Sequence, residues 1–188
     1  MPRATDILRH EHDAILRMLE ATHEVAQRLE RGEHVAPETL DDLIEFFRLF
    51  ADRCHHGKEE DLLFPLLESK GLPRDGGPIG VMPYEHEEGR ELIRQMNESA
   101  KAYAQGDAGA AKAWAAAARG YATLLSEHIF KENNVLFMIA ERLLTDAEQQ
   151  ELAAAFDRVE IEKMGAGTHE RLHAKMDRLL SEISAVKS

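Results

Sequence analysis

A histidine and a glutamate occur four residues apart in two similar stretches of this sequence, HHGKEEDLLF, which begins at His55, and HIFKENNVLF, which begins at His128. On a helix, a spacing of four places both side chains on one face, roughly 40° apart. Alignment of the stretches pairs His55 with His128 and Glu59 with Glu132. Imidazole nitrogens and carboxylate oxygens are common ligands of transition metals. The repeat therefore predicts that both halves of the chain contribute to metal binding.

One further histidine precedes each pair by a similar interval. His12 lies 43 residues before His55, and His86 lies 42 residues before His128. Each half is therefore expected to form a helix with one inward histidine, followed by an antiparallel helix with a histidine–glutamate pair. In an up-down-up-down four-helix bundle, these side chains would meet at one level of the core. The six candidate metal ligands are His12, His55, Glu59, His86, His128 and Glu132.

Four imidazoles and two carboxylates suit a pair of transition-metal ions, because carboxylates can bridge ions about 3.5–4 Å apart. Iron is the first expectation, with manganese and zinc as alternatives. A single histidine on an apolar helix face is more often a hydrogen-bonded core residue than a ligand. The whole set carries the prediction, because two matching repeats at helical spacing rarely arise by chance.

The elements that position these residues are expected to be helices, because no stretch alternates with the two-residue period of a strand. Residues 71–83 contain four glycines and three prolines and are expected to form a loop. Thr145 and Glu148 have the spacing of a capping box. We therefore expect an all-α chain with helices over about 5–29, 38–69, 83–105, 110–144, 145–162 and from 168 onward. It should form one domain, 1–188, with a four-helix bundle over 5–144 and a C-terminal helical extension over 145–188.

The composition narrows the classes of partner. The net charge is −12, with 35 acidic residues against 23 lysines and arginines, which disfavours nucleic acid and anionic membranes. A single cysteine, Cys54, precludes an internal disulfide, and it is either a buried inert thiol or a redox-active one. The sequence shows no signal peptide and no apolar run of membrane-spanning length, so a cytoplasmic location is expected.

The helix that carries the first pair offers a second register, His56 with Glu60. Adjacent α-helical residues point about 100° apart, so only one pair should face the core. Both the repeat and the apolar stripe favour His55 and Glu59. His56 is then expected on the helix flank, and Glu60 is a candidate hydrogen-bond partner of a ligand imidazole. Two other candidates for such contacts are Tyr121, which is otherwise a core tyrosine, and His169, which with His173 is otherwise a surface residue.

The pattern H, HxxxE, H, HxxxE over about residues 5–144 resembles the hemerythrin-like (HHE cation-binding) domain proteins of bacteria. The resemblance implies a four-helix bundle that holds a non-haem di-iron centre, with oxo- or hydroxo-bridged iron, and implies that Glu59 and Glu132 bridge the ions. Oxygen-carrying hemerythrins have a fifth histidine where this chain has Arg90. The more open iron pair resembles that of bacterial proteins linked to nitric-oxide stress and iron–sulfur cluster repair. Those proteins typically carry an N-terminal cysteine-containing domain, and from the sequence we do not expect one in this chain.

Three classes of function fit these observations. The first is a di-iron protein that reacts with oxygen, peroxide or nitric oxide, in stress defence or in repair of iron centres. The second binds, stores or senses oxygen, nitric oxide or iron without turnover. The third is a structural bundle, which is disfavoured because unpaired buried carboxylates and imidazoles are costly without a cation. The sequence identifies neither a protein partner nor a catalytic residue.

Overall fold

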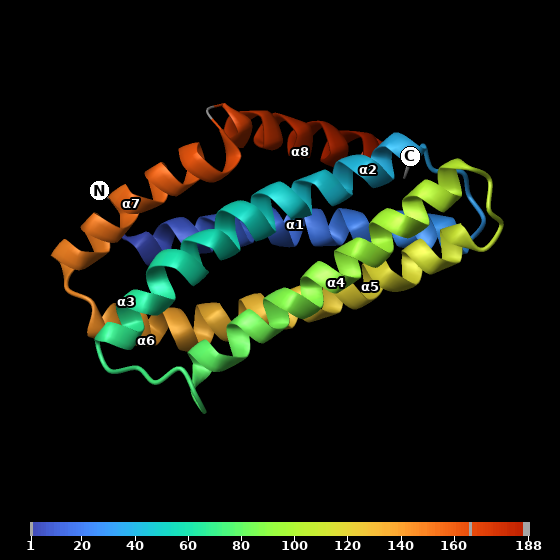
Figure 1. Cartoon of the computed structure of the whole chain (residues 1–188). Coiled ribbons are helices and arrows are strands. Elements are labelled where there is room, and N and C mark those ends of the chain that lie inside the picture. The colour runs from blue at the N-terminus through green and yellow to red at the C-terminus, as the bar shows by residue number, and fades with distance from the viewer. Residues whose placement is uncertain (1, 166, 186–188) are drawn as a thin grey trace.

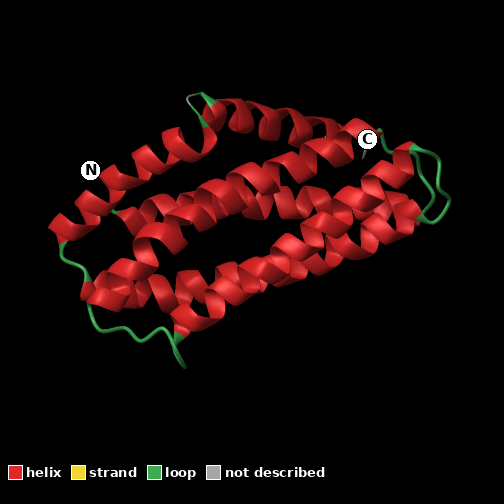
Figure 2. Ribbon diagram, in the orientation of Figure 1, coloured by secondary structure: helices red, strands yellow, loops and turns green. Residues whose placement is uncertain are grey.

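The computed structural model describes residues 2–165 and 167–185, and every regular element in these ranges is helical (Figure 1, Figure 2). Three segments, named η, have the wider turns of a π-helix. The elements are α1 (Ala4–Glu30), α2 (Pro37–Phe46), η1 (Phe47–His56), η2 (Glu59–Leu63), α3 (Phe64–Ser69), α4 (Pro78–Ala104), α5 (Ala110–Lys131), η3 (Glu132–Leu136), α6 (Phe137–Leu143), α7 (Asp146–Met164) and α8 (Thr168–Ala185).

Four long helical rods form the body of the molecule. Two rods are single helices, α1 and α4, and two are composite: α2 continues through η1 and η2 into α3, and α5 continues through η3 into α6. Each rod reverses the direction of the preceding one, and the rods lie lengthwise beside each other (Figure 1). α5 packs along both α1 and α4, and α2 packs against α4. The predicted all-helical architecture is confirmed over the described residues.

The apolar core is divided into two clusters along the rods. The larger cluster includes Phe46, Phe47 and Trp114, and the smaller one includes Phe64 and Phe137. Along each rod, the predicted metal ligands lie where the residues of the larger cluster give way to those of the smaller one. The rods thus enclose a narrow polar layer between two apolar regions, which keeps water from the polar groups.

Local sequence explains where several helices begin and end. Gly71 follows α3 with φ of 93°, a conformation that glycine adopts without strain, as expected of a helix C-terminus. Thr145 accepts a hydrogen bond from the backbone N–H of Glu148, whose side chain bonds back to the Thr145 N–H. The predicted capping box is confirmed, and it starts α7.

The sequence-based expectation is wrong at two places. α4 begins at Pro78 instead of Pro83, so Pro83 lies inside the helix. The extra turn is stabilised because it buries Ile79 in the smaller apolar cluster, which outweighs the hydrogen bond that a proline cannot make. A regular α-helical stripe through His128, Glu132 and Leu136 also predicts that Val135 and Leu143 lie in the core, but they are 47% and 37% exposed.

The last two helices cover one side of the bundle (Figure 1). α7 packs against α1 and η1, and α8 packs against α1 and α2. Four buried side chains of α8, among them Leu172 and Met176, join the larger apolar cluster, and Arg28 of α1 donates a 2.5 Å hydrogen bond to the carbonyl of Ile183. These helices therefore complete the core. Among the described residues, no helix is long and apolar enough to cross a membrane.

Candidate metal centre

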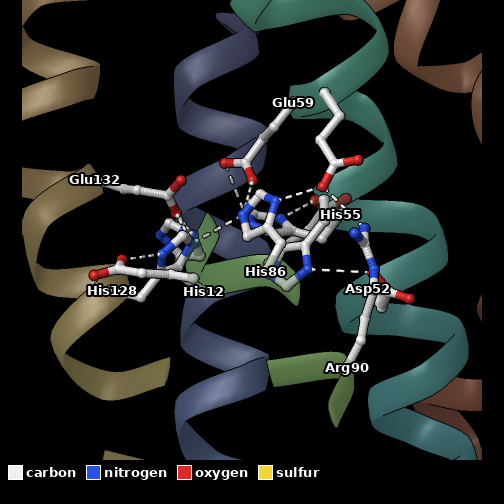
Figure 3. Close-up of polar contacts among 12 residues, drawn as sticks. His12, Asp52, His55, Glu59, His86, Arg90, His128 and Glu132 are labelled. Carbon is white, nitrogen blue, oxygen red and sulfur yellow. Dashed lines mark hydrogen bonds and ion pairs between the residues drawn. The ribbon is translucent and has the colours of Figure 1, made fainter. Parts of the chain in front are cut away.

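The six predicted ligands converge in the polar layer, and all six are buried (Figure 3). Glu59 lies between imidazoles from different halves of the chain: its Oε1 is 3.5 Å from Nε2 of His55, and its Oε2 is 3.6 Å from Nε2 of His86. Glu132 has the same relation to the other two imidazoles, with its Oε2 3.1 Å from Nε2 of His12 and 3.3 Å from Nε2 of His128. Each glutamate therefore faces one histidine from each half.

Two of the four imidazoles are oriented by the same three-residue arrangement. Nδ1 of His55 lies 2.8 Å from a carboxylate oxygen of Glu11, and Lys58 donates to the other oxygen of Glu11. In the second half, Nδ1 of His128 lies 2.8 Å from Glu85, which also accepts from Lys131. A carboxylate accepts but does not donate, so Nδ1 of each imidazole carries the proton.

The other two imidazoles, of His86 and His12, each bond to a residue of the opposite half of the chain. That residue directly follows Glu59 or Glu132 in the sequence. Nδ1 of His86 is 2.6 Å from Glu60, and Nδ1 of His12 is 2.9 Å from Oδ1 of Asn133. Arg90, at the position of the fifth histidine of oxygen carriers, donates a 2.9 Å bond to Glu60 and so supports His86 indirectly. With all four Nδ1–H groups bonded outward, the four Nε2 lone pairs point inward.

The inward atoms fit a ligand set for metal ions. Both carboxylate oxygens of Glu59 and of Glu132, and Nε2 of His12 and of His55, have no hydrogen-bond partner among the described residues. Nε2 of His86 lies 3.1 Å from Nε2 of His128, within hydrogen-bond distance. Neighbouring ligands of an ion with bonds of about 2.1 Å are separated by about 3.0–3.5 Å. The observed separations lie in this range, except the 3.6 Å between Glu59 and His86.

The charges of the group also favour cations. Burial and the facing carboxylate of Glu132 raise the pKa of Glu59 well above its usual value. Burial also tends to raise the pKa of Glu132, but the charges and hydrogen bonds of His128 and His12 outweigh burial and lower this pKa. Burial opposes the charged form of His128, yet Glu132 and Glu85 together raise its pKa to about 9. Positive charge is therefore stabilised between the two glutamates.

His56 departs from the sequence-based expectation of a flank position, because its side chain is only 4% exposed. It ends η1, whose hydrogen bonds reach one residue further than in an α-helix. A turn of this kind holds about 4.4 residues, so adjacent side chains diverge by roughly 80° instead of 100°. His55 and His56 can both reach the interior for this reason.

By distance alone, two groups of four residues could each hold an ion. One group is His12, His55, Glu59 and Glu132, and the other is His56, Glu59, His86 and His128. Ring geometry argues against His56 in the second group. Its ring lies parallel to that of His86, with 10° between the planes and 3.7 Å between the centroids. An imidazole binds a metal in its own ring plane, so two stacked rings cannot share an ion.

The remaining candidates lie outside this group. Tyr121 packs its ring against Phe47 at 4.9 Å and makes no hydrogen bond to any described ligand candidate. His169 pairs with His173 at 4.6 Å between ring centroids and lies near Glu11 and Glu160. Those two glutamates already share the ammonium of Lys58.

The thiol of Cys54 is buried, and no disulfide partner exists in the sequence. Burial, with a contribution from the nearby Glu11 carboxylate, raises its pKa to about 12. Because the thiolate is the reactive form of cysteine, this environment favours the inert alternative over the redox-active one.

Comparison with known proteins agrees with the ligand pattern. Residues 3–140 match the hemerythrin HHE cation-binding domain. The chain belongs to this family. Relatives of this hemerythrin-domain chain include the iron-sulfur cluster repair protein YtfE of Edwardsiella ictaluri, 34% identical over 122 residues, and that of Dickeya chrysanthemi, 32% identical over 136 residues. The matches cover 60% and 70% of this chain but only 53% and 61% of those relatives. An uncharacterised Mycobacterium tuberculosis protein, Rv1995, is 25% identical over 86% of this chain and 63% of its own length.

The sequence reasoning missed the residues that orient the imidazoles, although the repeat contains them. A glutamate directly precedes the first histidine of each half of the hemerythrin domain, Glu11 before His12 and Glu85 before His86. A lysine also follows each histidine of the pairs by three residues. Extending the comparison of the two halves beyond the histidine–glutamate pairs would have found both.

Proposed function

We propose that this protein holds two iron ions through His12, His55, Glu59, His86, His128 and Glu132, and that it reacts with a small oxidant. Oxygen, peroxide and nitric oxide are the candidate oxidants, and stress defence or repair of iron centres is the proposed setting. The observation that carries the proposal is the set of four inward Nε2 lone pairs around two facing carboxylates. The printed name of the YtfE relatives, iron-sulfur cluster repair protein, supports the setting.

We further infer that residues 5–144 form an up-down-up-down four-helix bundle and that 145–188 extend it within one domain. This arrangement brings one ligand-bearing segment from each rod to the polar layer. Bound iron would supply an electron-transfer centre and an open position for a diatomic or peroxide ligand. The protein itself supplies fixed imidazole orientations, through Glu11, Glu60, Glu85 and Asn133, and a layer from which bulk water is excluded.

Reconstitution with ferrous iron without oxygen, followed by metal analysis, tests the centre. We expect close to two iron ions per chain, and manganese offered alone should bind more weakly at equal concentration, as the usual affinity order of divalent ions predicts. His55→Ala and Glu59→Ala should abolish the two-metal site, whereas His56→Ala, the matched change one residue away, should leave it occupied. Near-zero iron in the unaltered protein would refute the proposal. Loss in His56→Ala with retention in His55→Ala would move the ligand register by one residue.

Stopped-flow mixing of the reduced protein with oxygen separates reaction from storage. Because Arg90 replaces the fifth histidine, we expect an open coordination position that favours reaction of the metal pair with oxygen. The near-ultraviolet absorption of an oxo-bridged ferric pair should then develop without a stable oxygen adduct. A long-lived, reversible adduct would favour the alternative, a protein that carries or senses a small molecule without turnover.

A further inference from the structure

A cavity of about 290 Å³ lies between η1 and α4, beside the metal centre. It is lined by Arg48, Asp52, His56, His86, Gly89, Arg90, Ile93, Arg94, Asn97 and Tyr121. None of the other five candidate ligands borders it. The stacked rings of His56 and His86 therefore form the wall between the cavity and the centre.

Several polar side chains of this cavity have unused hydrogen-bonding capacity. His56 is 96% buried (4% exposed), and its Nδ1 has no hydrogen-bond partner, although Asp52 lies 3.5 Å away. The hydroxyl of the buried Tyr121 and the amide of the half-buried Asn97 make no hydrogen bond with the described residues. A buried polar atom is usually hydrogen-bonded, so the unpartnered Nδ1 of His56, with two further free polar groups in the same cavity, indicates a polar occupant.

The charge of the lining favours an anion. Three arginines face one aspartate. Arg90 is held by Asp52, Glu60 and Glu87, and Arg94 by Glu91. Arg48 forms no ion pair with any described residue, so its guanidinium is free to bind a carboxylate or another oxyanion in a two-point contact.

The size of the cavity sets the scale of the occupant. Its volume equals that of about ten water molecules in the liquid, far more than a diatomic gas requires. Gly89 contributes to this space because it has no side chain, and a Cβ atom there would lie 3.5 Å from the Tyr121 ring, an ordinary contact distance. A larger residue at this position would project into the cavity.

We propose that this cavity is a binding site for a small oxyanion, such as an organic carboxylate of about ten non-hydrogen atoms. Arg48 supplies the charge, and His56, Asn97 and Tyr121 supply hydrogen bonds. The proposal goes beyond the reaction of the metal pair with a diatomic or peroxide, because the occupant lies behind the His56–His86 wall and does not bind the metals. His86 is the link between the two sites.

Calorimetric titration of the iron-loaded protein with succinate and with inorganic phosphate tests the site, with neutral succinamide as the probe lacking charge. We expect saturable binding of at least one anion, and binding of succinamide at least about 10-fold weaker. Arg48→Gln should weaken anion binding on the order of 10-fold. The matched control is Arg53→Gln. Arg53 lies on the same segment but outside the cavity, and it also forms no ion pair with the residues that the structure describes. This change should alter binding less than about 2-fold.

Gly89→Leu gives a second test, because it fills the cavity without removing a charge and should abolish anion binding. Iron content is measured on every sample. An unaltered protein that holds two irons but binds neither anion up to tens of millimolar would overturn this inference and leave the metal centre standing. Equal losses in Arg48→Gln and Arg53→Gln would also overturn it, because they would show a general surface-charge effect. An unaltered protein without iron would instead refute the proposed centre.

Discussion

Replacement of Lys58 by methionine should destabilise the protein far more than the same replacement of Lys131, although the two lysines occupy matching positions of the repeat. The side chain of Lys58 is completely buried, and its ammonium group bonds to Glu11 and, at 2.5 Å, to Glu160 of α7. It also lies 5.6 Å from the centre of the Phe156 ring. Among the described residues Lys131 bonds only to Glu85, and its side chain is 38% exposed.

The burial of the two lysines sets the expected magnitudes. Removing one partner of a buried ion pair leaves an uncompensated charge and costs about 3–5 kcal/mol. A pair open to solvent contributes about 0–1 kcal/mol. For a chain of this length, each kcal/mol shifts the melting temperature by roughly 2–4 °C. We therefore expect a fall of about 6–20 °C for Lys58→Met and at most about 4 °C for Lys131→Met.

Thermal unfolding followed by circular dichroism, on protein treated with a chelator, measures these changes without the added stability from bound metal. Lys58→Met combined with Glu11→Gln should recover part of the loss, because the stranded carboxylate is then neutral. Equal shifts for the two lysine variants would refute the reasoning, as would a double variant less stable than Lys58→Met alone.

Two further predictions concern the orienting groups and the C-terminal helix. Glu85→Gln should weaken iron binding about 10–100-fold, because His128 loses the carboxylate that orients it. Competition with a chelator measures this affinity. The control Glu88→Gln, on the exposed face of α4, should leave the affinity unchanged. Burial opposes ionisation of Asp42, but Lys175 and Arg178 of α8 outweigh it and lower its pKa. The state in which α8 is docked therefore binds fewer protons at Asp42 than the undocked state does. The contribution of Asp42 to docking is complete above its ordinary pKa and is lost as the pH falls through the lowered pKa. The protection of the α8 amides against hydrogen exchange, taken relative to the intrinsic exchange rate at each pH, should fall below about pH 4, and unchanged protection down to about pH 2 would contradict the assignment.

Much of the fold follows from periodicity, and the errors have local causes. The glycine at position 71 and the Thr145 capping box act within a few residues, so their effects were predictable from sequence. The helical turn before Pro83 depends on burial of Ile79 against residues distant in the chain, which local rules do not capture. Val135 sits at core spacing for an α-helix, but the wider turn of η3 shifts it toward solvent.

For the metal centre, too, some features could be predicted from the sequence and others could not. The histidine–glutamate spacing predicted which side chains meet, and the structure brings all six together, while their roles as ligands stay a prediction. The burial of His56 was not predictable, because the rule of 100° per residue fails in η1. Nor could the sequence alone show that Lys58 is shared between Glu11 and Glu160, because that contact depends on how α7 docks.

The wide turns also affect how this chain accommodates changes of length. In an uninterrupted α-helix, one inserted residue rotates everything beyond it by about 100° and would turn His55 and Glu59 out of the core. A segment such as η1 can absorb an added or deleted residue by changing the number of its wide turns, because a turn closed by i→i+5 bonds takes in about one extra residue. The rod can therefore gain or lose a residue before the metal centre while the side chains on either side still point in the same directions. Insertions and deletions in the loop-side half of the rod then need not disturb the metal-binding half.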